Sequence, residues 1–335
     1  MESRVQQTAT IPWSTSLGLK VGEFVRVRSK DQILATLDSR GSLDGMPFMP
    51  EMLHHCGQRY RVFKRAEKSC DTIHTGAGRR VQDAVHLEGL RCDGSAHGGC
   101  QALCLYWWRE AWLERDSGAG TREAPAPVLG GTSCTDAELM ASTRQEGDGT
   151  AEAFSCQVTQ LHEFTEELDW WDPREIVREI QCGNVSAPRA VGVMMHAAGN
   201  VLRRRIGQRP EPHITGRCGA TTPSGTLPGL KVGDWVEVKS QEEIEQTLNA
   251  KQRNRGLHFD IEMLPYCGRR MRVLQKVDRI IDEKTGAMRP LPNDCWILEG
   301  ALCEGYQSRS RLFCTRQIYS YWREIWLKPA ADPGL

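Results

Sequence analysis

The sequence predicts a mainly β fold that is built twice and joined by a helical connector. Three observations indicate this: phrases recur about 211 positions apart, the recurring phrases alternate apolar and polar residues, and the segment between them carries helix signals. "EMLHHCG" starts at Glu51 and "EMLPYCG" at Glu262, a separation of 262 − 51 = 211. "LGLKVGEFVRV" from Leu17 and "PGLKVGDWVEV" from Pro228 have the same separation. Such a series indicates duplication of one unit.

Each copy is predicted to consist mostly of strands. "VGEFVRVR" and "VGDWVEVK" alternate apolar and polar residues, which is the period of a half-buried strand, and the Gly-acid pair before each marks a turn. "DQILATL" and "EEIEQTL" have helical spacing and predict one short helix. "YRVFKRA" and "AVHLEGL", with their counterparts "MRVLQKV" and "CWILEGA", predict two further strands. The closing phrases "LYWWREAWLER" and "YSYWREIWLKP" fit either a helix or a strand.

Composition divides the chain into five parts. A linker follows the first repeat because Gly, Ala, Pro and Ser are frequent there, and a Pro- and Gly-rich linker precedes the second repeat. The connector between the linkers predicts one helix that starts at Asp172 and Pro173 and ends near Gly183, and another capped by Ser186. The predicted parts are 15–115 (first repeat), 116–153 (flexible linker), 154–206 (helical connector), 207–226 (linker) and 227–330 (second repeat).

The short strands around the Gly-Asp turn of "VGDWVEV" resemble an SH3-like barrel, the fold of many small binding modules. The chain as a whole resembles an uncharacterised bacterial protein family with a tandem SH3-like barrel repeat around a Trp-rich middle. This resemblance implies a mainly β fold with two duplicated SH3-like barrel domains, and it implies no activity. We expect the recurring tryptophans in the barrel cores or at a contact between the barrels. We expect the Trp170–Trp171 pair where the helices dock on a barrel, with a cleft between the copies as the alternative. The recurring tryptophans are Trp108, Trp112, Trp322 and Trp326.

Charge and hydropathy exclude several classes of protein. Lys+Arg and Asp+Glu both number 43, so the net charge is zero, which disfavours nucleic-acid binding because phosphate contacts demand a basic excess. The sequence contains no run of about 18 apolar residues, so it predicts no membrane-spanning helix. The N-terminal segment lacks the apolar core of a signal peptide, so the predicted location is cytoplasmic. Thirteen cysteines in that compartment favour metal ligation or reactive thiols over disulfides.

The recurring cysteines predict metal sites. A thiolate-bound metal stabilises a small barrel, and zinc prefers four tetrahedral ligands. We predict zinc, with iron or an iron–sulfur cluster as the alternative. Buried thiols that simply fill the core are the other interpretation, and His54, His55 and His97 are further donors near the first set. The predicted ligands are Cys56, Cys92, Cys100 and Cys104 in the first copy, and Cys267, Cys303, Cys314 and Cys295 in the second, where the first three of each set correspond.

Two functions fit this pattern, and the sequence leaves open whether the protein is an enzyme. The first is a metal-binding tandem-barrel binding or scaffold protein that holds a peptide, a protein or a small molecule between the repeats. The alternative is a metal-dependent enzyme that acts on a small molecule in specialised metabolism, with an open metal position in the second repeat. Cys156 and His162 are a further candidate nucleophile–base pair. The sequence contains no P-loop, dinucleotide fingerprint, HExxH or GxSxG motif.

Overall fold

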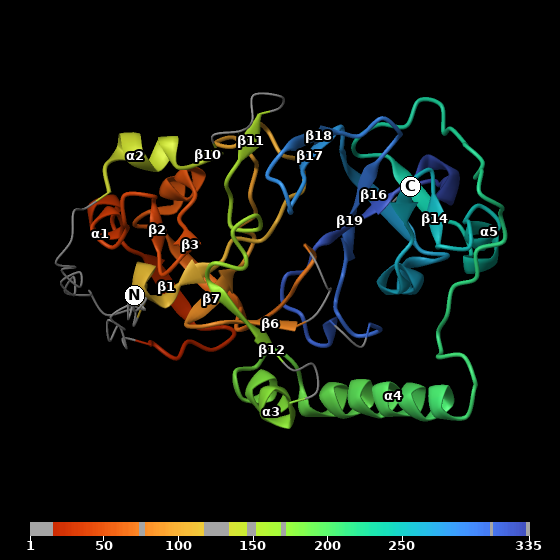
Figure 1. Ribbon diagram of the computed structural model, residues 1–335, viewed down its shortest axis with the longest axis horizontal. Coiled ribbons are helices and arrows are strands. Elements are labelled where there is room, and N and C mark those ends of the chain that lie inside the picture. Colours follow the sequence, from red (N-terminus) through yellow and green to blue (C-terminus); the bar gives the residue numbers. More distant parts are fainter. Residues whose placement is uncertain are drawn as a thin grey trace, which may run out of the picture.

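The computed structural model describes residues 16–73, 78–116, 134–145, 152–168, 172–308 and 311–332. Strands predominate in these residues, so the mainly β class is confirmed. Two lobes lie side by side, and one long helix runs along the second of them (Figure 1). Most of the predicted linker 116–153 and the pair Trp170–Trp171 lie outside the described residues.

The first copy forms a five-stranded antiparallel sheet with the order β8-β7-β4-β1-β9. β1 pairs with β4 on one side and β9 on the other, so the first and last strands of the copy are neighbours. The strands are β1 (Phe24–Val27), β4 (Arg59–Arg65), β7 (Ala84–Leu87), β8 (Trp108–Arg109) and β9 (Leu113–Arg115).

The second copy repeats this sheet with the order β20-β19-β16-β13-β21. The register is also repeated, because Phe24 pairs with Arg61 in the first sheet and Trp235 pairs with Arg272 in the second. The pairing register shifts at the same place in both sheets. The shift lies between Val62 and Lys64 in the first copy and between Val273 and Gln275 in the second. The strands are β13 (Trp235–Val238), β16 (Arg270–Lys276), β19 (Trp296–Leu302), β20 (Tyr319–Trp322) and β21 (Leu327–Pro329).

The closing Trp-rich phrase of each copy is neither one helix nor one strand. It forms a short strand, a 3-10 turn and a second strand, which turns the two recurring tryptophans of the phrase into the same core. The rings of Phe48 and Trp112 meet edge to face at 5.1 Å, and those of Phe259 and Trp326 at 5.2 Å. The core position expected for the recurring tryptophans is confirmed. The two turns are η2 (Glu110–Trp112) and η5 (Glu324–Trp326).

The short helices of each copy follow from their caps. The predicted helix after the first strand is present in both copies, and Ser29 and Ser240 cap it through capping boxes with Gln32 and Glu243. The phrase that contains Glu51 or Glu262 forms a 3-10 helix. These helices are α1 (Lys30–Leu34), α5 (Gln241–Glu245), η1 (Pro50–His55) and η3 (Ile261–Tyr266).

Short hairpins complete the two lobes. β12, from the connector, adds to the hairpin β5–β6 of the first copy and makes a three-stranded sheet. A short helix, α2 (Asp136–Ala141), lies in the described part of the predicted linker. The small strands are β2 (Ser42–Leu43), β3 (Met46–Pro47), β5 (Lys68–Cys70), β6 (Gly78–Val81), β10 (Arg144–Gln145), β11 (Ala153–Phe154), β12 (Thr165–Leu168), β14 (Arg253–Asn254), β15 (Leu257–His258), β17 (Arg279–Ile281) and β18 (Met288–Pro290).

The two copies dock on each other through reciprocal contacts. The Thr315 N–H of the second copy donates to the Lys68 carbonyl in β5 of the first, at 3.2 Å. The Gln101 N–H of the first copy donates to the Arg279 carbonyl in β17 of the second, also at 3.2 Å. Lys68 and Arg279 are 211 positions apart, and Gln101 and Thr315 are 214 apart, so the same contact is made twice. Each hairpin therefore packs on the other copy's last cysteine-containing loop.

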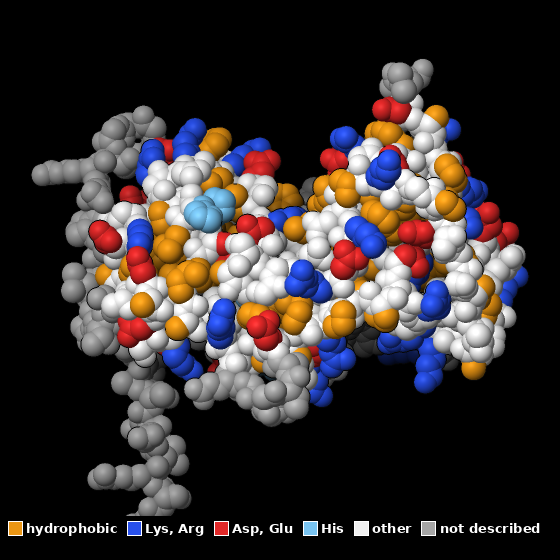
Figure 2. All heavy atoms as spheres, turned by 90° about the horizontal axis from the view of Figure 1, so that it is seen from above, with side chains coloured by type: hydrophobic (Ala, Val, Ile, Leu, Met, Phe, Trp, Pro, Cys, Tyr) orange, Lys and Arg blue, Asp and Glu red, His pale blue; other side chains and the backbone are white. Residues whose placement is uncertain are grey.

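The connector contains the two predicted helices, α3 (Pro173–Gln181) and α4 (Ala187–Arg205). Asp172 caps α3 by accepting from the Arg174 N–H at 2.9 Å, and Ser186 is the N-cap residue of α4. The helices contact both copies: Val193 of α4 lies in one apolar cluster with Phe313 of the second copy, and Glu175 of α3 pairs with Arg80 of the first. Among the described helices, none combines the length and apolar character needed to cross a bilayer. Acidic and basic side chains are interspersed over the face seen in Figure 2, as the zero net charge suggests.

Candidate metal centre

Glu51, Cys92 and His97 form a buried group of metal-ligating side chains in the first copy. One ligand atom from each lies within 4.8 Å of the others, and no other group of three or more His, Cys, Asp and Glu meets this condition in the described part of the chain. Glu51 comes from η1, and the other two come from the loop between β7 and β8. Elements far apart in sequence thus deliver an oxygen, a sulfur and a nitrogen to one point.

Two of the distances in this group are close to the edges of a tetrahedral metal site. The Cys92 Sγ lies 3.3 Å from His97 Nε2 and 3.6 Å from Glu51 Oε1. Zinc bonds of about 2.3 Å to sulfur and about 2.0–2.2 Å to nitrogen or oxygen give tetrahedral edges of roughly 3.4–3.6 Å. The other ring nitrogen, Nδ1, lies 3.2 Å from the same Glu51 oxygen. Because an imidazole gives an ion one nitrogen only, the ring must shift before one nitrogen shares an ion with both Cys92 and Glu51.

A tight loop presents His97 to Cys92. Gly94 has φ +73°, and a Cβ at this position would lie 2.2 Å from the Cys100 carbonyl oxygen, so only glycine fits. The Gly94 carbonyl accepts from the His97 and Gly99 N–H groups at 3.1 and 2.9 Å. These bonds turn the chain back on itself and bring the imidazole to the thiol five positions earlier.

Two polar atoms of the group are buried without a hydrogen bond. Within the described residues, Glu51 Oε2 and His97 Nδ1 have no hydrogen-bond partner, although Nδ1 is at ion-pair distance from Oε1. Glu51 is 5% exposed and His97 is 1% exposed. An orphaned buried polar atom costs about 1–3 kcal/mol and is rare in native structures. A cation bound by the carboxylate would remove this penalty at Glu51 Oε2, whereas the imidazole can offer an ion only one of its two nitrogens.

Burial also keeps the thiol of Cys92 protonated while no metal is bound. Removal from water, followed by the neighbouring Glu51 carboxylate, raises the pKa of Cys92 well above its ordinary value. A bound divalent cation reverses this preference because the thiolate is the ligand. Metal binding at this group should therefore release a proton.

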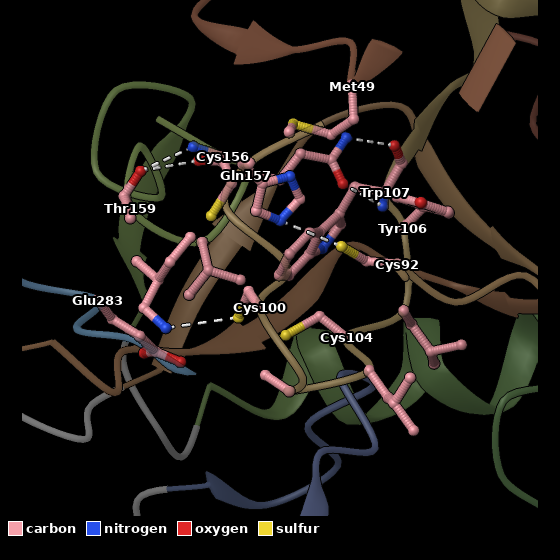
Figure 3. Close-up of a pocket in the computed structure, with 16 residues that line it drawn as sticks. Met49, Cys92, Cys100, Cys104, Tyr106, Trp107, Cys156, Gln157, Thr159 and Glu283 are labelled. Atoms are coloured by element: carbon pink, nitrogen blue, oxygen red, sulfur yellow. Dashed lines mark hydrogen bonds between the residues drawn. The ribbon is translucent and has the colours of Figure 1, made fainter. Parts of the chain in front are cut away.

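Cys92 and His97 of the group border a small cavity that three further cysteines also line. The cavity measures about 40 Å³, and Figure 3 shows Cys92, Cys100, Cys104 and Cys156 gathered around it. Since roughly 10–15 Å³ of such space holds one water, an ion with a water ligand fits. The connector closes one side, where the Gln157 amide bonds the backbone of Trp107. Burial raises the pKa of Cys156 to about 11 and that of Cys104 to about 12.

The eight predicted ligands lie in different surroundings. In the first copy, Cys92 belongs to the group, Cys100 and Cys104 line the same cavity, and Cys56 packs at the edge of the apolar core. In the second copy, Cys267 packs against the core and Cys295 lies in an apolar cluster with Val277 and Ile297. Cys303 and Cys314 line a separate cavity. In neither copy do the four predicted thiols come together with their sulfur atoms within 4.8 Å of one another. The segments that carry them pack against different parts of the protein.

Other sequence candidates have local partners. His55 Nδ1 lies 2.7 Å from the Tyr60 hydroxyl, and the His54 carbonyl accepts from Gln58. His162 Nε2 lies 3.3 Å from an Asp71 oxygen, and the Cys156 N–H donates to Thr159. From the sequence, His97 is only a further donor near the first cysteine set, and Glu51 has no predicted role. The phrase around Glu51 recurs in both copies, which was the available signal for its importance.

Glu262, the counterpart of Glu51 in the second copy, has different hydrogen-bond partners. Glu262 accepts hydrogen bonds from the backbone N–H groups of Tyr306, Gln307 and Ser308 at 3.2, 2.8 and 2.8 Å. Arg311 Nη1 lies 4.0 Å from Cys303 Sγ, while its Nη2 atom bonds both oxygens of Asp260 at 2.8 and 2.7 Å. The second copy thus places a guanidinium beside the thiol and backbone amides around the carboxylate.

Comparison of the chain with protein-family models, with curated proteins and with solved structures found no significant match. Function is therefore inferred from the side chains and geometry of this chain alone.

Proposed function

We propose that the protein is a zinc-binding tandem-barrel scaffold that holds one zinc ion between Glu51, Cys92 and His97. The observation that carries this proposal is the buried trio itself, with two edges near those of a tetrahedral site and an orphaned carboxylate oxygen. The two five-stranded sheets with equal strand order fit two SH3-like barrels. The ion would then fasten a loop of the first barrel to its 3-10 helix.

The donor set favours zinc over the other metals considered. One sulfur, one nitrogen and one oxygen suit a borderline cation such as Zn²⁺. An iron–sulfur cluster requires several thiolates, whereas the trio contributes only Cys92. Cys92 and His97 border the cavity, so a water held there can supply the fourth ligand.

A scaffold role follows from where the metal loop lies. The loop continues into Cys100 and Gln101, which contact β17 of the second copy. Ordering the loop by an ion should therefore stiffen the contact between copies. A second cavity of about 230 Å³ is lined by Cys70 and Thr72 of the first copy and by residues of the second. Its position supports a small ligand bound between the repeats.

Metal analysis of the purified protein tests the proposal. We expect elemental mass spectrometry to find one zinc ion per chain. Chelation should remove the zinc, and reloading should restore the same zinc content. The variant Cys92→Ala should lose the zinc, whereas the matched variant Cys303→Ala should keep it. Zinc that stays in Cys92→Ala, or a protein that takes up no metal on reloading, would overturn the proposal.

A thiol enzyme is the second candidate, because the trio also has the order of a nucleophile, a base and an orienting carboxylate. Cys92 Sγ faces His97 Nε2, and Nδ1 of the same ring faces Glu51. Burial opposes this function, since it raises the pKa of Cys92 and leaves only about 40 Å³ beside it. Rapid alkylation of Cys92 by iodoacetamide at neutral pH in metal-free protein would favour the enzyme, and protection of Cys92 would favour the scaffold.

A metal-dependent enzyme is the remaining alternative, because three protein ligands and an open position also describe catalytic zinc. The trio favours the first copy for such a site, since the second copy has amides and Arg311 where the first has an imidazole. An enzyme would bind zinc with an exchangeable water. Substitution by cobalt makes this visible, because an added anion would change the visible spectrum of an open site and leave a closed site unchanged.

A further inference from the structure

Cys70 and Cys314 form a thiol pair across the contact between the copies. Cys70 ends β5 of the first copy, and Cys314 lies in the last loop of the second; they are 1% and 3% exposed. Both thiols line one cavity, and they lie on segments that are hydrogen-bonded to each other. The Thr315 N–H and hydroxyl both donate to the Lys68 carbonyl, at 3.2 and 2.9 Å, which holds the loop against β5.

The same contact exists at the equivalent place without a second thiol. Cys100 is the counterpart of Cys314, and Ile281 is the counterpart of Cys70 (281 − 70 = 211). There the Ile281 N–H donates to Cys100 Sγ at 3.4 Å. At one of the two equivalent contacts Cys100 therefore lies against Ile281. At the other contact Cys314 lies against Cys70.

Cationic groups surround the thiol pair. Arg316 is 3% exposed, and its Nη1 donates to the Cys70 carbonyl at 3.1 Å and to the Thr72 hydroxyl at 2.7 Å. Its Nη2 pairs with Glu283 at 3.3 Å. The neighbouring Cys314 thiol, with Arg316 and Arg311, lowers the pKa of Cys70 to about 7 against the effect of burial. Arg316 bonds the backbone of Cys70 itself, so this geometry favours Cys70 as the nucleophile, and the raised pKa of Cys314 suits a resolving thiol.

Both thiols border a cavity that a small molecule can enter. The cavity of about 230 Å³ is lined by Cys70, Cys303 and Cys314 together with Arg311 and Arg316. A wider groove of about 600 Å³ adjoins it and shares Arg311. Asp260 and Glu262 also line the cavity, Arg311 pairs with Asp260 and Arg316 pairs with Glu283, so acidic and basic groups balance there.

We propose that Cys70 is a modification site for low-molecular-weight disulfides and that Cys314 resolves the product into a disulfide between the two copies. The Cys70 thiolate attacks one sulfur of the disulfide, forms a mixed disulfide and releases one thiolate of the reagent. Cys314 then loses its proton to solvent and attacks the Cys70 sulfur, which releases the second thiolate. The two protein thiols are oxidised, and the reagent is reduced to two thiols.

The product would lock the interface between the copies. The bond joins positions 70 and 314, and a cross-link over so long a loop stabilises a fold chiefly by restricting the unfolded chain. Excess low-molecular-weight thiol reverses both steps. The interface would then respond to the thiol–disulfide balance of its compartment independently of the metal.

Oxidised glutathione and peptide mapping by mass spectrometry test the proposal on the full, metal-loaded chain. We expect a Cys70–Cys314 disulfide in the native sequence and a glutathione adduct on Cys70 in Cys314→Ser. Cys70→Ser should form neither, and Cys303→Ser should behave as the native chain does. The partly exposed Cys218 serves as an internal control for reagent activity. Modification of Cys218 with Cys70 untouched, or a Cys70–Cys303 bond in its place, would overturn the proposal.

The equivalent contact supplies a gain-of-function test that does not remove a native residue of the pair. Ile281→Cys places a second thiol beside Cys100, where Ala102 is the counterpart of Arg316 (316 − 102 = 214). The new pair should oxidise at least about tenfold more slowly than Cys70 and Cys314, because it lacks the arginine. Equal rates at the two positions would overturn the role assigned to Arg316.

Discussion

Glu51 in the first copy and Glu262 in the second occupy the same position of a duplicated unit, yet their partners differ. Glu262 accepts from three backbone N–H groups, whereas Glu51 faces a thiol and an imidazole and keeps one oxygen unpaired among the described residues. The loop after the second copy's Gly305 is three residues longer than the loop after Gly94. The three residues after Gly305 turn their backbone N–H groups onto the carboxylate, while the shorter loop presents the side chain of His97. Duplication thus preserved the sheets, and the loops diverged in chemistry.

The cysteines at the end of these loops diverged as well. Cys100 meets Ile281, and Cys314 meets Cys70, although the backbone contacts around them are reciprocal. A shared frame with two different local environments suggests a division of labour, with metal in the first copy and thiol exchange in the second. Substitutions in the two copies therefore test how far the copies have diverged.

The two cores should be equally important for stability. Trp112→Ala and Trp326→Ala should each lower the free energy of unfolding by about 3–5 kcal/mol, because each ring is fully buried against a phenylalanine. Guanidinium titration followed by circular dichroism measures this. A loss below about 1 kcal/mol for either variant would show that the two cores are not equivalent.

Zinc affinity should depend on the first copy alone. His97→Ala should weaken the Kd for zinc at least about 100-fold, since even outer partners of a metal site change affinity by 10–100-fold. The matched variant His55→Ala should leave the Kd unchanged, because His55 bonds Tyr60 instead. Competition with a chromophoric chelator gives both values. Equal effects of the two substitutions would contradict the assigned site.

The two equivalent glutamates should respond differently when no metal is present. Glu262→Gln should destabilise the metal-free protein by about 1–3 kcal/mol, because the new amide NH₂ cannot accept from the three backbone donors. Glu51→Gln should change the stability of the metal-free protein little and should abolish zinc binding. Thermal unfolding of the chelated proteins makes the comparison, and a larger loss for Glu51→Gln would refute it.

Zinc binding should become tighter as the pH rises. Burial raises the pKa of Cys92 above its ordinary value, so the thiol is protonated at neutral pH and must lose one proton to bind the ion. Affinity should therefore increase by about tenfold per pH unit between pH 6 and 8, once the buffer's own competition for zinc is subtracted. Calorimetry in buffers of different ionisation enthalpy should count the released proton, and a pH-independent affinity would argue against a Cys92 ligand.

Much of the frame could be predicted from the sequence, because a duplicated pattern of strands, caps and tryptophans reports local structure twice. The strand at Phe24, the helix capped by Ser29 and the buried Trp112 all follow from such local signals. The candidate site was harder to predict. Recurrence identifies what the copies share, so it gave Cys56 and Cys100 the same weight as Cys92 and discounted His97, which has no counterpart. Contacts such as Cys314 with Cys70 depend on how the copies dock, and no local pattern encodes this.

X-ray absorption at the zinc edge tests the central claim most directly, because it counts sulfur neighbours of the bound ion. The proposed site predicts one sulfur at about 2.3 Å and the remaining ligands as nitrogen or oxygen at about 2.0–2.2 Å. The signal should vanish in His97→Ala. A first shell of four sulfurs, or a zinc signal unchanged by that substitution, would contradict the assignment to Glu51, Cys92 and His97.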